Sequence, residues 1–167
     1  MKHRTLFVVG VILVSLLSGC SKKHSQDVLK SSYSMTIEPG VSVGPVHSGM
    51  TMKQVVAELG KPVKNEDRML TYQNLWVFFS DDGFVGYVYC LDPSTNGLST
   101  EAFAGRTKKG IGIGSSRADV ISAYGEPTAT RPEYDHKENE VMIYEPLRLE
   151  FHIRNGNVYL IAVKFRK

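Results

Sequence analysis

The sequence predicts an α+β protein: two tandem helix–antiparallel-sheet repeats form a two-layer sandwich, with the helices packed on one face of the sheet. Two observations support this. Residues 49–62 recur as residues 114–127 at a constant offset, with glycines, a valine and a proline in matching places. Each copy is followed by segments rich in aromatic and β-branched residues that are separated by turn signals.

The first 19 residues have the three parts of a secretory signal peptide. Lys2 and Arg4 give a basic start, residues 6–17 are almost wholly apolar, and the small pair Ser18-Gly19 precedes Cys20. An apolar stretch of about a dozen residues is short for a spanning helix, which needs about 20. We expect cleavage before Cys20; the alternative is a short transmembrane anchor that stays uncut.

The cleavage site resembles the bacterial lipobox in Leu17-Ser18-Gly19-Cys20. The resemblance implies that the Cys20 thiol carries a diacylglyceryl group, a covalent lipid that is the only attached group we expect. Two or three acyl chains hold a protein stably on a membrane. Ser21 stands where an Asp often retains Gram-negative lipoproteins at the inner membrane, so we expect a lipid-anchored protein of the cell envelope, on the outer membrane facing the periplasm in a Gram-negative cell.

The remaining chain divides by composition. Residues 20–40 comprise the lipidated Cys20 and a polar segment without sustained periodicity, which predicts a flexible tether. We assign repeat 1 to residues 41–93, a connector to residues 94–110 and repeat 2 to residues 111–167.

Each repeat begins with the signals of a short helix. Thr51 and Ser116 are predicted N-caps, with Gln54 and Asp119 three residues later at the capping-box position. A glycine and, two residues on, a proline end each helix, at Gly60 and Pro62 in the first copy and Gly125 and Pro127 in the second.

Strands are expected after each helix. The first copy gives residues 69–80, a turn at 81–83 and residues 84–91; the second gives 141–144, 147–154, the hairpin turn Asn155-Gly156 and 157–165. Residues 128–140 are predicted to be a longer loop in the second copy.

Helix, Gly-x-Pro and antiparallel strands, occurring twice, resemble the repeat of the β-lactamase inhibitor protein fold and the SmpA/OmlA small outer-membrane lipoproteins. The matching residues are Gly49-Met50-Thr51, Val55, Leu59, Gly60 and Pro62 with Gly114, Val120, Tyr124, Gly125 and Pro127. The resemblance implies a binding protein and no enzyme. The SmpA/OmlA lipoproteins assist outer-membrane protein assembly, and the inhibitor proteins bind a secreted enzyme across their sheet. It implies no particular contact residues.

Composition argues against a nucleic-acid partner and against an intrachain disulfide. The chain has 20 Lys and Arg against 17 Asp and Glu, and two of the basic residues lie in the signal, so the mature chain is near neutral and gives no reason to expect nucleic acid as a partner. With Cys20 lipidated, Cys90 has no partner for an intrachain disulfide. We expect Cys90 to be a buried thiol, the alternative being a disulfide to another chain.

No pattern of catalytic residues emerges. His136, in an acidic loop, is a weak metal candidate, and the preferred interpretation is a solvated loop with no metal. Residues 110–116 resemble a phosphate loop but lack its third glycine and its Gly-Lys-Ser/Thr, so we expect an entry turn. The sequence therefore predicts no catalytic residue and no enzyme activity; an enzyme would need a cleft where His136 or His152 meets a carboxylate and a hydroxyl.

The remaining candidates are aromatic residues on the predicted strands. If they lie on the face that the helices leave uncovered, they would anchor an interface; otherwise they pack under the helices. The candidate binding residues are Tyr72, Trp76, Tyr87, Tyr89, Tyr144 and Tyr159.

The sequence thus predicts a membrane-anchored, non-catalytic module that binds an envelope protein, in an outer-membrane assembly or inhibitor-like role. The alternative is an envelope lipoprotein that binds a small apolar or cell-wall ligand between sheet layers.

The lipid anchor is testable by replacing Cys20 with serine. We expect the Cys20→Ser chain to leave the membrane fraction during detergent-free washing, because serine cannot form the thioether to the lipid. Immunoblots of membrane and soluble fractions measure this, with Cys90→Ser as the matched control. A Cys20→Ser chain that stays with the membrane would show that the lipid is not the anchor.

Overall fold

The computed structural model describes residues 35–95 and 97–165. The predicted signal peptide, Cys20 and the tether up to residue 34 lie outside these ranges. The tether was expected to reach residue 40, but Ile37 belongs to the fold: it is fully buried in the first strand.

The described chain is mostly β. A small sheet consists of β1 (Ile37–Glu38), β2 (Ser42–Val43) and β3 (Val46–His47). The large sheet contains β4 (Lys64–Glu66), β5 (Met69–Thr71), β6 (Leu75–Phe79), β7 (Val85–Leu91), β8 (Ala129–Pro132), β9 (Glu140–Tyr144), β10 (Leu149–Arg154) and β11 (Asn157–Lys164). Two α-helices, α1 (Met52–Leu59) and α2 (Arg117–Tyr124), and two 3-10 turns, η1 (Pro93–Thr95) and η2 (Glu145–Leu147), complete the elements.

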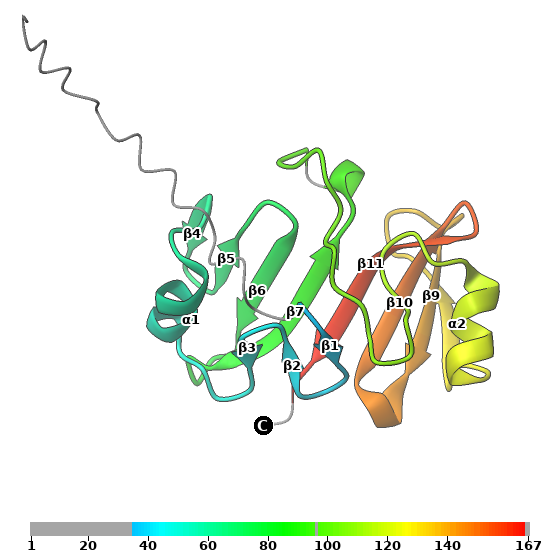
Figure 1. Ribbon diagram of the computed structural model, residues 1–167, viewed down its shortest axis with the longest axis horizontal. Coiled ribbons are helices and arrows are strands. Elements are labelled where there is room, and N and C mark those ends of the chain that lie inside the picture. The colour runs from blue at the N-terminus through cyan, green and yellow to red at the C-terminus, as the bar shows by residue number, and fades with distance from the viewer. Residues whose placement is uncertain (1–34, 96, 166–167) are drawn as a thin grey trace, which may run out of the picture.

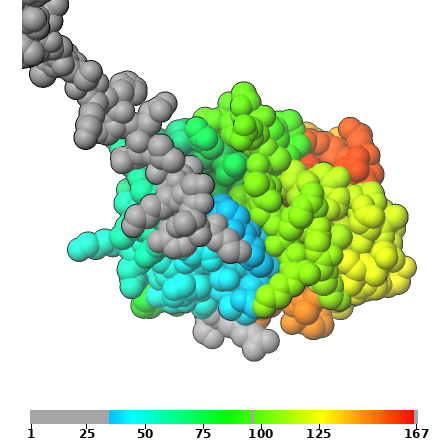
Figure 2. All heavy atoms as spheres, in the orientation of Figure 1, coloured from blue at the N-terminus to red at the C-terminus, as the bar shows by residue number. Residues whose placement is uncertain are grey.

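The large sheet is antiparallel throughout, in the order β4-β5-β6-β7-β11-β10-β9-β8. Strands β7 and β11 meet at its centre, where five residue pairs run from Leu91↔Leu160 to Tyr87↔Lys164. In Figure 1 the small sheet lies in front of the large one, with α1 towards one end and α2 towards the other. Figure 2 shows this covered side, where the segment before α2 fills the space beside the small sheet.

The predicted fold class, α+β with two tandem helix–sheet repeats in a two-layer sandwich, is wrong. The structure has two antiparallel sheets, of three and eight strands, and two helices of eight residues each. The strands expected in two units join into one sheet because β7 pairs with β11. Helices this short cannot form a layer across eight strands, and the small sheet lies beside them on the same face.

The predicted helix ends are confirmed. The side chain of Thr51 accepts a hydrogen bond from the Gln54 backbone N–H, and the Gln54 side-chain oxygen accepts one from the Thr51 backbone N–H. Ser116 and Asp119 form the same capping box. Each helix ends at a glycine with positive φ, Gly60 at 80° and Gly125 at 78°. None of the helices in the described ranges is long and apolar enough to cross a bilayer.

The strand predictions hold in part. Residues 69–80 split into β5 and β6, and residues 128–140, expected to be a loop, contain β8. The edge strand β4 was not expected either. The Asn155-Gly156 turn is confirmed, with φ of 51° and 79° as a tight primed hairpin requires.

The main core lies between one face of the large sheet and the elements that cover it. Val55 of α1, Val120 of α2 and Val43 of β2 are fully or almost fully buried against strand residues such as Phe151. Cys90 is in this core as predicted, with no exposed surface. Burial raises the pKa of its thiol far above the usual range, so the thiol is protonated and inert.

The central position of Phe151 makes it a test of this core. Phe151→Ala should lower the free energy of unfolding by about 3–5 kcal/mol, because it leaves a cavity where the side chain is fully buried. Phe84→Ala, at a ring that is 43% exposed, should change it by less than about 1 kcal/mol. Urea titrations followed by circular dichroism measure both, and equal losses would contradict this assignment of the core.

Candidate functional site

The large sheet has a second face, opposite the helices and the small sheet. Side chains alternate between the faces of a strand, so while Val77 and Val88 enter the main core, the flanking aromatic residues of β6 and β7 point to the other side. A smaller apolar cluster on that side is made only of residues from β6, β7 and β11: Trp76, Tyr89, Leu91, Tyr159, Leu160 and Ala162. We call this side the open face.

Four rings form an aromatic cluster on the open face: Trp76, Phe78, Tyr87 and Tyr89, each partly exposed. The rings of Phe78 and Tyr87 stack at a centroid distance of 4.3 Å, and Tyr89 lies 5.1 Å from Phe78 and 5.3 Å from Tyr87. Trp76 meets the edge of Phe78 at 6.3 Å. Such contacts favour defined orientations of the rings.

The six tyrosine and tryptophan residues predicted to bind a partner are divided between the faces. Trp76, Tyr87 and Tyr89 are in the aromatic cluster, and Tyr159 lies on the same face at an irregularity in the β10–β11 pairing. Tyr72 and Tyr144 lie on the helix side, packed with the main core.

Tyr72 and Tyr144 connect the helix ends to the sheet. The Tyr72 hydroxyl donates to the carbonyl of Gly60 at 3.1 Å, and the Tyr144 hydroxyl donates to the carbonyl of Gly125 at 2.8 Å. Burial raises the pKa of Tyr72 to about 12. Both hydroxyls therefore satisfy backbone groups that the helix ends leave without a partner.

Beside the aromatic cluster, the open face carries a buried network of charged and polar side chains. The Glu133 carboxylate accepts hydrogen bonds from Asn139 Nδ2 at 2.9 Å, from His152 Nδ1 at 2.9 Å and from the Tyr159 hydroxyl. Burial opposes ionisation of Glu133, but these three hydrogen bonds outweigh it and lower the pKa of Glu133 to about 2. An ionised carboxylate only accepts, so His152 donates from Nδ1.

The other nitrogen of His152 faces a second carboxylate. His152 Nε2 lies 3.8 Å from a Glu150 oxygen, too far for a hydrogen bond, and this buried nitrogen has no hydrogen-bond partner in the part of the chain described here. The His152 ring and the Lys164 ammonium lower the pKa of Glu150 to about 2, although burial acts in the opposite direction. Two ionised carboxylates thus flank one imidazole.

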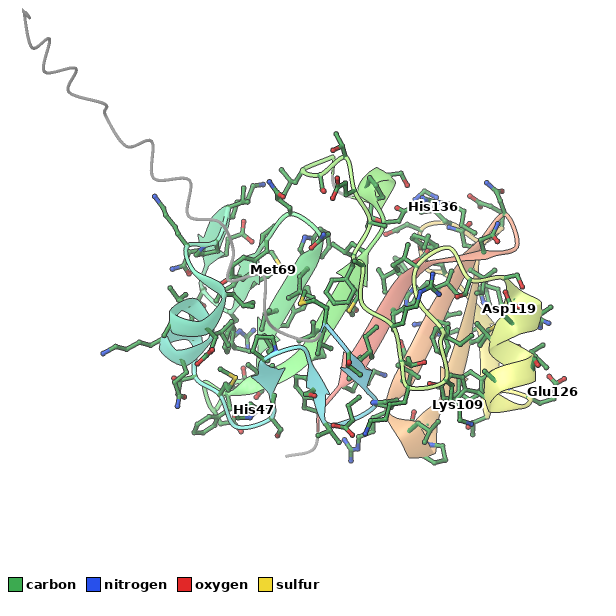
Figure 3. The ribbon with its side chains drawn as sticks, in the orientation of Figure 1. His47, Met69, Lys109, Asp119, Glu126 and His136 are labelled. Atoms are coloured by element: carbon green, nitrogen blue, oxygen red, sulfur yellow. The ribbon has the colours of Figure 1, made fainter. Side chains whose placement is uncertain are left out.

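A hollow of about 430 Å³ opens next to this network. Its floor includes Trp76, His152 and Leu160, and its walls come from the β8–β9 loop and from η1. Figure 3 places His136, one of the lining residues, at the end of the sheet that also carries η1. The lining residues are Trp76, Ser94, Thr95, Arg131, Glu133, Tyr134, Asp135, His136, His152, Arg154, Tyr159 and Leu160.

The hollow brings near one another the three kinds of group that an enzyme would need. His152 and the Tyr159 hydroxyl both bind the Glu133 carboxylate, so the hydroxyl is already engaged. Burial and then Glu133 raise the pKa of Tyr159, which keeps this hydroxyl protonated. His152 Nε2, the nitrogen that would serve as a base, faces Glu150 and no hydroxyl. Within the described ranges, no three potential metal ligands gather.

The sequence of β10 carries a signal for this network. In β10, Leu149, Phe151 and Ile153 alternate with the polar residues Glu150, His152 and Arg154. Such alternation marks a strand with one covered and one open face. The partner of His152 was not predictable, because Glu133 reaches it from a loop 19 residues away.

The low pKa values of Glu133 and Glu150 predict acid sensitivity. Both carboxylates release protons more readily in the folded chain than in the unfolded one, where the pKa is about 4.5. Their stabilisation is therefore complete above about pH 4.5 and is lost as the pH falls towards about 2.

We expect Glu133→Gln to make the fall in the free energy of unfolding shallower across this pH window. Glu66→Gln, an exposed position in β4, is the matched control and should behave like the wild type. Urea midpoints measured at several pH values check this. The same pH dependence in all three proteins would exclude a role of Glu133 in acid unfolding.

Comparisons with known proteins leave the family open. No family model and no curated protein matches the chain. Among solved structures, a DUF4309 family protein (YjgB) from Bacillus subtilis is similar, with 13% identity over 71% of this chain and 80% of that one, and a TM-score of 0.49. This likeness does not bear on the resemblance to SmpA/OmlA lipoproteins, which stays a prediction.

Proposed function

We propose that the chain is a lipid-anchored, non-catalytic module of the bacterial cell envelope that binds a protein through the aromatic cluster of its open face. The observation that carries this proposal is the position of Trp76, Phe78, Tyr87 and Tyr89 together, on the face away from the helices. Trp and Tyr are the residues most enriched among those that dominate the energy of protein interfaces.

The geometry of the cluster supports a protein partner. The faces of Phe78 and Tyr87 are turned towards each other, with only 16° between their planes, so that their edges point outwards. Ring edges fixed in this way suit apolar contacts with the side chains of a protein surface, at low cost in conformational entropy. Lys164 and Glu150 adjoin the rings and supply charges at the border of the contact area.

The alternative function predicted from the sequence, binding of a small ligand between sheet layers, has less support. The space between the small and large sheets is filled by the main core, including Ile37, Val46 and Val163. The hollow described above lies on the open face instead.

Site-specific photo-crosslinking in cells tests the protein-binding proposal. A photoreactive phenylalanine analogue at position 87 should give a discrete crosslinked product, because Tyr87 is central to the cluster. The control position is 84, an exposed aromatic residue next to the start of α1, where we expect no such product.

The Trp76→Ala chain with the analogue at position 87 should lose most of this product, by about tenfold or more, if Trp76 is an interface anchor. Products from positions 87 and 84 in equal amounts, or no product from 87, would count against the proposal.

A further inference from the structure

The walls of the hollow on the open face are braced by contacts within the chain. The Glu133 carboxylate accepts hydrogen bonds from Asn139, His152 and Tyr159. On the other side, Arg154 is bound to Asp92 at 3.1 Å and lies over the Tyr159 ring at 4.3 Å. A site preformed in this way loses little freedom when a ligand enters.

Two side chains of the lining, Arg131 and Tyr134, are instead exposed. Arg131 of β8 lies in the same row of the sheet as His152, since both pair with Val141. Its guanidinium forms no ion pair with any described residue, and its hydrogen bond to the Pro132 carbonyl is long, at 3.4 Å. Tyr134, on the loop after β8, is 90% exposed. An aromatic ring with this much exposure beside a hollow is typical of a residue that contacts a ligand.

The floor adds a donor without a partner. Trp76 Nε1 is buried and has no hydrogen bond to any residue that the structure describes. Buried donors of this kind are rare and call for an acceptor. Trp76 Nε1 is covered by other atoms, so of these two donors the exposed guanidinium of Arg131 is the one that a ligand in the hollow can reach.

We propose that this hollow binds a small ligand through its carboxylate, which pairs with Arg131 while the body of the ligand lies between Trp76 and Tyr134. A guanidinium binds one carboxylate by two parallel hydrogen bonds. A phosphate with two charges fits less well, because the carboxylates of Glu133 and Asp135 line the same hollow. The volume of about 430 Å³ is within the range of pockets for small molecules.

The site goes beyond the protein contact proposed for the aromatic cluster, and its ligand has two natural sources. The carboxyl terminus of a short peptide and an acidic sugar both present a carboxylate on a compact, partly apolar body. The chain contains one tryptophan, Trp76, so its fluorescence reports directly on occupation of the hollow.

The test is a fluorescence titration of the full chain in detergent. The probes are acetyl-Ala-Ala with a free carboxyl end, the same peptide as its amide, N-acetylmuramic acid, N-acetylglucosamine and inorganic phosphate. We expect saturable binding of at least one carboxylate, and binding at least about tenfold weaker for its neutral counterpart. Which carboxylate binds identifies the source.

Arg131→Gln should weaken carboxylate binding by about tenfold or more and abolish the preference over the neutral counterpart. Lys64→Gln removes the same charge from the opposite edge strand, β4, and should bind like the wild type. Thermal unfolding by circular dichroism shows that both variants are folded, as their exposed positions predict.

Three results would overturn the proposal: no response to either carboxylate, unchanged binding by Arg131→Gln, or tighter binding of phosphate than of any carboxylate. None of them affects the crosslink from position 87, so failure of this site and failure of the protein contact are distinguishable.

Discussion

The pairing of β7 with β11 is the constraint on which the rest of the structure depends. These strands lie about 70 residues apart in the chain, and five residue pairs between them make a single sheet from two four-stranded halves. Because Cys90 and Ile161 pair here and are both fully buried, the middle of the sheet is also the middle of the main core. Every side chain on the open face takes its direction from this register, since a shift of one residue would exchange the two faces.

The same pairing brings the two parts of the open face together. Tyr89 of β7 stands opposite Ala162 of β11, and Ala162 stands opposite Glu150 of β10. The aromatic cluster and the charged network are therefore neighbours across the centre of the sheet, although they come from different halves of the chain. This proximity affects Tyr89, whose pKa is raised by burial and then by the charges of Tyr87 and Glu150.

Local signals in the sequence predicted local structure well. The capping boxes at Thr51 and Ser116 and the Asn155-Gly156 turn are present, because each depends only on residues within three positions. The fold class failed because it depends on which strands pair, and nothing near β7 or β11 specifies the partner. The small sheet was missed because two-residue strands show no periodicity.

The candidate site was predictable to a similar extent. Trp76, Tyr87 and Tyr89 were identified from strand composition, but Tyr72 and Tyr144 have the same composition signal and hold helix ends instead. Arg117 likewise stands where the first helix has the apolar Met52, and it forms two hydrogen bonds with Glu140, at 2.7 and 3.0 Å, which the helix pattern alone does not indicate. Such roles depend on contacts between distant segments.

The two edges of the large sheet, β4 and β8, determine how copies of this protein behave when crowded. A sheet edge with free N–H and C=O groups is a template for further strands, and crowding raises the risk of edge-to-edge polymerisation. Here β4 is three exposed residues, Lys-Asn-Glu, and β8 ends at Pro132, which lacks an N–H. Both ends of the sheet thus resist extension into fibrils, which leaves its broad surfaces as the places where copies can meet other molecules.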